Sequence, residues 1–279
     1  MNQIIQSYLD AHIKEYEIES YDQSTAFEHF INKCIINRLS TERFDPIDVM
    51  TDDGEIGLDG VAILLNGQLV TDLASCHVIY ENNRSVDVKI VFIQTKTSAS
   101  FDGGEISTFL KGVKHFFETN DVRPKTNHKM ENLISIKDYI YAQSINQPQK
   151  PSLEMYYVCC GRWSDENNLS NNIATDVRFF ESTRDFSTVN FYPFDIDKII
   201  ITYTEMRRKI RKTFLMEKRL PFYQMPGIKV AYFGLIKCKD IVRLLTDDQG
   251  ALFKNIFEDN VRDFQGYNSV NSEIKATLL

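Results

Sequence analysis

The chain has 279 residues, of which 43% are hydrophobic and 25% charged, so its composition is that of a folded protein with a sizeable buried core. Its formal net charge of −7 argues against a protein that coats nucleic acid without specificity, although binding depends on local charge. No stretch approaches the roughly 18 apolar residues of a membrane span, and the five cysteines lack CxxC spacing, which indicates a reduced cytoplasmic protein with no zinc site and no membrane partner.

The first half of the chain predicts a helix, three strands and two further helices. Apolar residues recur at helical spacing from Gln23 to Leu39, with Ser24 or Thr25 as the N-cap. Strands are expected after a polar loop, the first two joined by the turn residues Asn66-Gly67. The expected strands are Val61–Leu65, Gln68–Tyr80, Val88–Thr97 and Leu153–Cys160, and the expected helices cover about Glu105–Glu118 and Met130–Ser144.

The second half predicts a smaller region with both strands and helices. The polar stretch Ser164–Asn172 is the best boundary candidate, which gives domains 1–165 and 166–279. Beyond it we expect strands near Val189–Tyr192 and Lys229–Ile236, a basic helix over Ile196–Lys218, and helices over Lys239–Thr246 and from Gly250 onward. This order predicts an α/β fold, in which helices flank a mixed sheet and a mixed α/β extension follows.

Three polar residues next to the predicted strands are the best candidates for a chemical site. Asp59 precedes the apolar strand Val61–Leu65, although an Asp before a Gly is also a common turn former. Gln94 and Lys96 lie two residues apart on a later strand, so both point to one face and Thr95 to the other. Because lysine is almost never fully buried without a partner, Lys96 either reaches solvent at the strand end or faces a carboxylate.

Other acids lie near these residues, and each has a simpler explanation. Glu28, in the first predicted helix, is a candidate metal ligand, but a single helix glutamate is more often a solvated charge. Glu55 is either a second acid of the site or a loop charge. Asp102 and Glu105 could reach the same end of the sheet, although acids at a helix N-terminus are explained by the helix dipole.

Together these groups suit metal-dependent hydrolysis of a phosphodiester. Mg²⁺ prefers oxygen ligands, so its expected ligands are Asp59, the side-chain carbonyl of Gln94 and Glu28, with Mn²⁺ as an alternative ion. Such a cation polarises a phosphate and lowers the pKa of a bound water. Lys96 would orient that water or stabilise the developing charge.

The same residues carry a resemblance to known nucleases. A helix with an acid, LDG before a strand and Q-x-K on a later strand resemble the PD-(D/E)XK superfamily, in the QxK variant of Mrr-like restriction enzymes. More narrowly, three blocks look like the abortive infection phage resistance (AIPR) family. They are GLDGVAILLNG (57–67), VFIQTKTSASFDGGEISTFLKGVKHFF (91–117) and LFKNIFEDNVRDFQGYNSVNSEIKATL (252–278).

The resemblance implies a restriction-endonuclease-like core up to about residue 165, with Asp59, Gln94 and Lys96 as active-site positions and Glu28 as a less secure one. It also implies a Mg²⁺-dependent endonuclease in bacterial phage defence, with DNA as the favoured substrate and, by superfamily analogy, a homodimer. Two features depart from the pattern: Gln94 stands where many members have an acid, and the chain ends at Leu279, as expected of a shortened member or a fragment.

A basic segment is the second candidate site. Its residues Arg207, Arg208, Lys209, Arg211 and Lys212 could contact phosphates, which would make nucleic-acid affinity depend on salt. A solvated helix face explains the same residues equally well. Two other functions stay open for the whole chain: a catalytically weak nucleic-acid-binding or regulatory module, and a structural or interaction protein.

Overall fold

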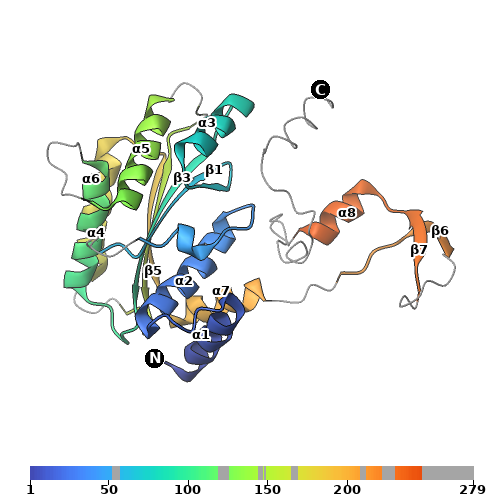
Figure 1. Cartoon of the computed structure of the whole chain (residues 1–279), viewed down its shortest axis with the longest axis horizontal. Helices are drawn as coiled ribbons and strands as arrows, with labels where there is room; N and C mark the ends of the chain where they lie inside the picture. The colour runs from blue at the N-terminus through green and yellow to red at the C-terminus, as the bar shows by residue number, and fades with distance from the viewer. Residues whose placement is uncertain are drawn as a thin grey trace. The chain divides into compact units, whose positions relative to one another are not determined.

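The computed structural model describes residues 1–51, 57–118, 126–143, 147, 149–164, 169–207, 212–221 and 230–246. These residues form two compact units, Met1–Met206 and a smaller one that starts at Arg207. The larger unit contains a five-stranded mixed sheet with helices on both faces, so the predicted α/β fold is confirmed (Figure 1). In the ranges described, no helix is long and apolar enough to cross a membrane.

The sheet has the strand order β2-β1-β3-β4-β5. Its strands are β1 (Gly60–Leu65), β2 (Gln68–Val70), β3 (Val88–Lys96), β4 (Ser152–Cys159) and β5 (Thr188–Phe194). β1 is antiparallel to both β2 and β3, whereas β3, β4 and β5 are parallel. Asn66 and Gly67, which join β1 to β2, both have positive φ angles, as the hairpin prediction requires.

Helices cover both faces of this sheet and enclose a core on each side. The first face packs against α1 (Gln3–Tyr16), α2 (Gln23–Leu39) and α7 (Ile196–Met206), and the short 3₁₀ helix η1 (Pro46–Asp48) follows α2. The second face packs against α3 (Leu73–Asn82), α4 (Gly103–Phe117), α5 (His128–Ala142) and α6 (Leu169–Thr183). Along β3, Phe92 belongs to the second core and Ile93 to the first, so side chains alternate between the cores.

Several sequence predictions need correction. The segment Gln68–Tyr80 is not one strand: β2 ends at Val70, and α3 begins at Leu73. α2 is capped by Asp22, which accepts hydrogen bonds from the main-chain N–H groups of Ser24 and Thr25, and neither of those residues is the cap itself.

The predicted boundary at residue 165 falls inside the larger unit. β5 pairs with β4 in parallel, and α6 and α7 pack onto the same sheet, so the unit continues to Met206. Of the predicted boundary stretch Ser164–Asn172, residues 169–172 belong to α6 and so to the larger unit.

The smaller unit contains β6 (Glu217–Pro221), β7 (Tyr232–Leu235) and α8 (Cys238–Leu245). β6 and β7 form an antiparallel pair. The expected basic helix Ile196–Lys218 is therefore too long, because α7 ends at Met206 and residues 217–221 form a strand. The helix expected from Gly250 onward lies outside the described residues.

Candidate functional site

Asp59 lies at the end of the sheet, directly before β1. The antiparallel register pairs Gly60 with Ile93, which places Asp59 opposite Gln94 of β3. The main-chain N–H of Asp59 donates to the Ile93 carbonyl at 2.9 Å, so the ladder continues one residue beyond the strand. The predicted juxtaposition of Asp59 and Gln94 therefore exists.

One oxygen of Asp59 collects three hydrogen bonds from β3. Its Oδ2 accepts from Gln94 Nε2 at 2.7 Å, from Thr95 N at 2.6 Å and from Thr95 Oγ1 at 2.8 Å. Thr95, which strand alternation predicts to face away from Gln94 and Lys96, thus supplies two of the three donors. All three bonds end on Oδ2, which leaves Oδ1 without a hydrogen bond from the described residues.

The amide of Gln94 has a fixed orientation and an unsatisfied oxygen. Its nitrogen donates to Asp59 and, at 3.3 Å, to the Thr95 carbonyl, so a flipped amide would place its oxygen against two acceptors. Gln94 is 4% exposed, and its Oε1 has no hydrogen-bond partner in the described part of the protein. A buried acceptor of this kind costs about 1–3 kcal/mol, which a cation or a water molecule would offset.

Burial dominates the electrostatics of Asp59. It raises the pKa of this carboxyl above its ordinary value, while the hydrogen bonds from Thr95 and Gln94 and the charge of Lys96 act in the opposite direction. A carboxylate that loses water and gains only part of that stabilisation from protein donors is a favourable place for a cation.

Lys96 is partly exposed and faces an acid on α4. Its Nζ lies 3.6 Å from Oε1 of Glu105, and its charge also acts on Asp59. Both alternatives for Lys96 hold in part, because its side chain reaches solvent at the strand end and also pairs with a carboxylate. The partner, Glu105, lies in the first turn of α4, where its sequence position alone favoured a dipole-complementing role.

Asn32 of α2 supports the loop end of β1 from the other face. Its Nδ2 donates to the Asp59 carbonyl at 3.3 Å, and its fully buried Oδ1 has no hydrogen-bond partner among the described residues. A Cβ at Gly60 would lie 2.3 Å from that Oδ1, so a larger residue there would displace the Asn32 side chain. Glu28 lies one turn before Asn32 in α2, on the same side of the helix, and is half-buried.

The residues fit a single oxygen-ligated cation better than a cluster of acids. In the ranges described, no three His, Cys, Asp or Glu side chains gather in a way that could hold a metal ion. The candidate ligands are instead one carboxylate and one amide oxygen, Asp59 and the unsatisfied Oε1 of Gln94. Mg²⁺ suits such a set because it retains several waters and needs few protein ligands. Glu55 lies outside the described residues.

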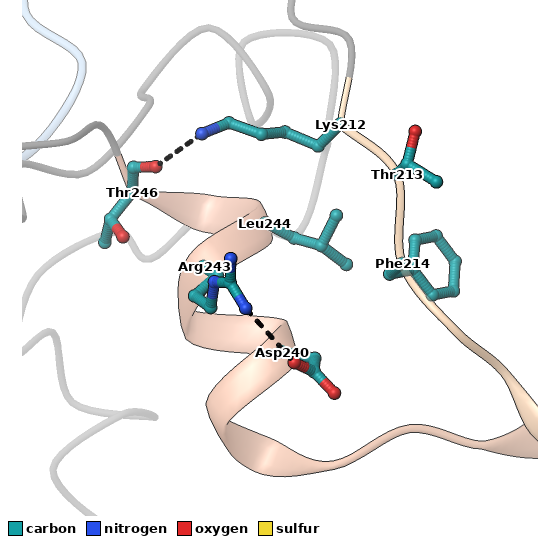
Figure 2. Close-up of a pocket in the computed structure, with 7 residues that line it drawn as sticks. All are labelled: Lys212, Thr213, Phe214, Asp240, Arg243, Leu244 and Thr246. Carbon is teal, nitrogen blue, oxygen red and sulfur yellow. Dashed lines mark hydrogen bonds and ion pairs between the residues drawn. The ribbon is translucent and has the colours of Figure 1, made fainter.

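The basic segment is described only at its two ends. Arg207 directly follows α7, whereas Arg208, Lys209 and Arg211 lie outside the described residues. Lys212 lines a pocket of about 330 Å³ in the smaller unit, together with Thr213, Phe214, Asp240, Arg243, Leu244 and Thr246 (Figure 2). Within this pocket, Lys212 Nζ donates a hydrogen bond of 3.4 Å to the Thr246 carbonyl. Nη1 of Arg243 lies 4.0 Å from Oδ1 of Asp240.

Three residues at the end of the sheet were not predicted as members of the site, namely Asn32, Thr95 and Tyr157, and Glu105 was predicted to reach this end only as the less favoured alternative. Only Glu105 had a recognisable signal, as an acid shortly after the Q-x-K strand. Comparisons of the chain with models of known protein families, with curated proteins and with solved structures give no match.

Proposed function

We propose that this protein is a metal-dependent endonuclease that hydrolyses phosphodiester bonds of nucleic acid, with DNA as the favoured substrate. The observation that carries the proposal is the buried Asp59 carboxylate, which accepts a hydrogen bond from the Gln94 amide, whose own Oε1 is unsatisfied, and on which the charge of Lys96 acts. An oxygen pair with an adjacent cationic side chain is the combination that phosphodiester hydrolysis requires.

In this proposal each side chain has a distinct role. Asp59 and the Gln94 carbonyl would hold Mg²⁺ or Mn²⁺, with Glu28 as a further candidate ligand. When bound, the metal supplies Lewis-acid polarisation of the phosphate. Lys96 stabilises negative charge on the phosphate oxygens or orients the attacking water, for which a compact ammonium group is well suited. Thr95 keeps the Asp59 carboxylate in place through its main-chain N–H and its hydroxyl.

The smaller unit would add contacts to the nucleic-acid backbone. Lys212 and Arg243 bring two cations to one pocket, and Phe214 supplies an aromatic ring there (Figure 2). Cations bind phosphates, and aromatic rings stack with exposed bases. Arg207, Arg208, Lys209 and Arg211 precede Lys212 in sequence and would supply further phosphate contacts.

The resemblance of three sequence blocks to the AIPR family supports a role for this activity in bacterial phage defence, in the cytoplasm. A homodimer would let two such sites cut both strands of a duplex. The rival proposal is a nucleic-acid-binding or regulatory module with little catalysis, and the neutral Gln94 favours it, because an amide attracts a cation less strongly than a carboxylate does. A structural or interaction protein is favoured instead by the exposed apolar side chains of β6, β7 and α8, among them Leu220, Phe233 and Val242.

The decisive experiment is cleavage of supercoiled plasmid and of single-stranded RNA by the purified protein, with Mg²⁺, with Mn²⁺ and with chelator. The variants are Lys96→Ala and Asp59→Ala, and Lys89→Ala, at the opposite end of β3, is the matched control. We expect metal-dependent cutting that falls by about 10²-fold or more in the two site variants and is unchanged in the control. Folded wild-type protein that cuts neither substrate with either metal would reject the nuclease.

A further inference from the structure

Glu105 joins two side chains from different strands. One carboxylate oxygen, Oε1, lies 3.6 Å from Lys96 Nζ at the end of β3. The other, Oε2, accepts a hydrogen bond of 3.0 Å from the Tyr157 hydroxyl of β4. Lys96 and Tyr157 lie on neighbouring parallel strands, so one carboxylate of α4 spans the end of the β3–β4 pair.

Both the main chain and the side chain of Glu105 are held in place. Asp102, the N-cap of α4, accepts a hydrogen bond of 2.9 Å from the main-chain N–H of Glu105. Tyr157 is fully buried, and its ring packs against Phe101 and Phe109. Burial, and after it the nearby Glu105, raises the pKa of Tyr157 far above its ordinary value. The hydroxyl therefore stays protonated and donates a hydrogen bond to the Glu105 carboxylate.

Lys96 therefore interacts electrostatically with two acids. It forms an ion pair with Glu105, and its charge also acts on Asp59. The neutral Gln94 cannot hold an ammonium group by charge, so among the described residues of this strand end Glu105 supplies the second negative charge. The side chain of Lys96 is 35% exposed, and without this partner it is free to turn towards solvent.

We propose that Glu105 is a positioning residue, held by Tyr157, that keeps the Lys96 ammonium at the end of β3, where its charge acts on the Asp59 carboxylate. This inference rests on the proposed nuclease function and names how its lysine is oriented. Ion pairs between partly exposed groups contribute little to stability, so the pair matters for geometry rather than for folding. Misplacing a catalytic group by about 1 Å can cost on the order of 10²-fold in rate.

The test compares Glu105→Gln and Tyr157→Phe with Glu131→Gln, which removes an exposed acid of α5 far from β3 in sequence. The first readout is the NMR signal of the Lys96 ammonium group, assigned by its loss in Lys96→Arg. Its hydrogens exchange slowly with solvent only while the group is held. The second readout is kcat and KM for metal-dependent cleavage, and the third is the melting temperature.

We expect Glu105→Gln to accelerate the exchange of the Lys96 ammonium and to lower kcat by about 10-fold to 10²-fold, with KM and the melting temperature nearly unchanged. Tyr157→Phe should have a smaller effect in the same direction, and Glu131→Gln none. An unchanged Lys96 signal in Glu105→Gln overturns the inference, and so does faster exchange with normal kcat. If the wild-type protein cuts nothing, the proposed function fails, and the NMR comparison alone still decides whether Glu105 holds Lys96.

Discussion

At the scale of single residues, Asp59 combines two opposing demands. Three donors on one oxygen fix its position, yet burial raises its pKa above the ordinary value, so the ionised form is disfavoured in the folded protein. Residues that serve a ligand are commonly kept at some cost in stability. The cost at Asp59 depends on pH and, in the proposed function, also on metal, so it can be measured.

The first prediction concerns Asp59→Asn in chelator. A carboxyl whose folded-state pKa is raised stabilises the fold below its unfolded pKa and loses that contribution as pH rises through the folded value. The variant should therefore melt at a higher temperature than the wild type near pH 7, and the difference should shrink as the pH falls through the raised folded-state pKa towards the unfolded value of about 4. Added Mg²⁺ should stabilise the wild type and not the variant. A variant that is less stable at neutral pH would contradict the burial argument.

The second prediction concerns Gln94→Glu. The new carboxylate would face Asp59 Oδ2 where the amide now donates at 2.7 Å, and two carboxylates so close cannot both ionise without a cation. In chelator the variant should lose about 1–3 kcal/mol of stability, measured by urea unfolding. With Mg²⁺ it should gain more stability than the wild type does. Gln68→Glu, on β2, is the strand control, and equal Mg²⁺ responses of variant and wild type would exclude a metal at this position.

The site was predictable from sequence only where side-chain alternation decides the geometry. Gln94 and Lys96 share the face of β3 that Phe92 occupies, as their spacing predicts. Thr95 could not be found this way, because it contacts Asp59 partly through its main-chain N–H, which every residue has. The position of Glu105 next to Lys96 depends on how α4 packs against the sheet, and the local sequence pattern does not predict that packing.

At the scale of elements, strongly patterned segments were predicted well and an ambiguous one was not. α2 and β1, with clear helical and apolar patterns, occur where expected. The residues of α3 include several that suit strands, such as Val78, Ile79 and Tyr80, and they misled the prediction. The signal that decides is Asp72, whose Oδ1 accepts from the Ser75 N–H at 2.8 Å and so starts the helix.

The third prediction tests this cap. Asp72→Ala should lower the free energy of unfolding by about 1 kcal/mol at neutral pH, measured by urea unfolding. The hydrogen bond from the Ser75 main chain holds the pKa of Asp72 below its ordinary value of 3.8. Its stabilisation is therefore present above that pH and is lost as pH falls through the folded-state value. The gap between wild type and variant should narrow in acid. Asp72→Asn retains a capping oxygen and should stay close to the wild type at pH 7.

At the scale of the whole molecule, the two units differ in how they are built. Both cores consist of residues from Met1–Met206. In the smaller unit, by contrast, α8 has no buried residue and β6 is exposed along its length. A two-stranded sheet such as the β6–β7 pair has little stability by itself. The unit boundary was placed too early because a polar loop within a fold and a linker between folds have the same composition. The pairing of β5 with β4 shows that the stretch lies within one fold. Local sequence composition does not reveal this pairing, because it joins two separate segments of the chain.

In the proposed function, the larger unit carries out the chemistry and the smaller unit contacts phosphates. The fourth prediction is that Lys212→Ala combined with Arg243→Ala weakens nucleic-acid binding without lowering kcat at saturating substrate. Each lost phosphate contact reduces the slope of log affinity against log salt by about 0.9 on duplex DNA. The double variant should therefore lower that slope by about 2, measured by fluorescence anisotropy over a series of salt concentrations.

The matched control for the fourth prediction is Lys218→Ala combined with Lys239→Ala, which removes the same charge from exposed positions of the same unit that do not line the pocket. If both pairs weaken binding equally, net charge alone explains the effect and the pocket has no special role. If neither pair changes the salt dependence, the smaller unit does not contact phosphates. A fall in kcat at saturation with intact binding would instead connect the pocket to catalysis and contradict the separation of roles, since Asp59, Gln94 and Lys96 all belong to the larger unit.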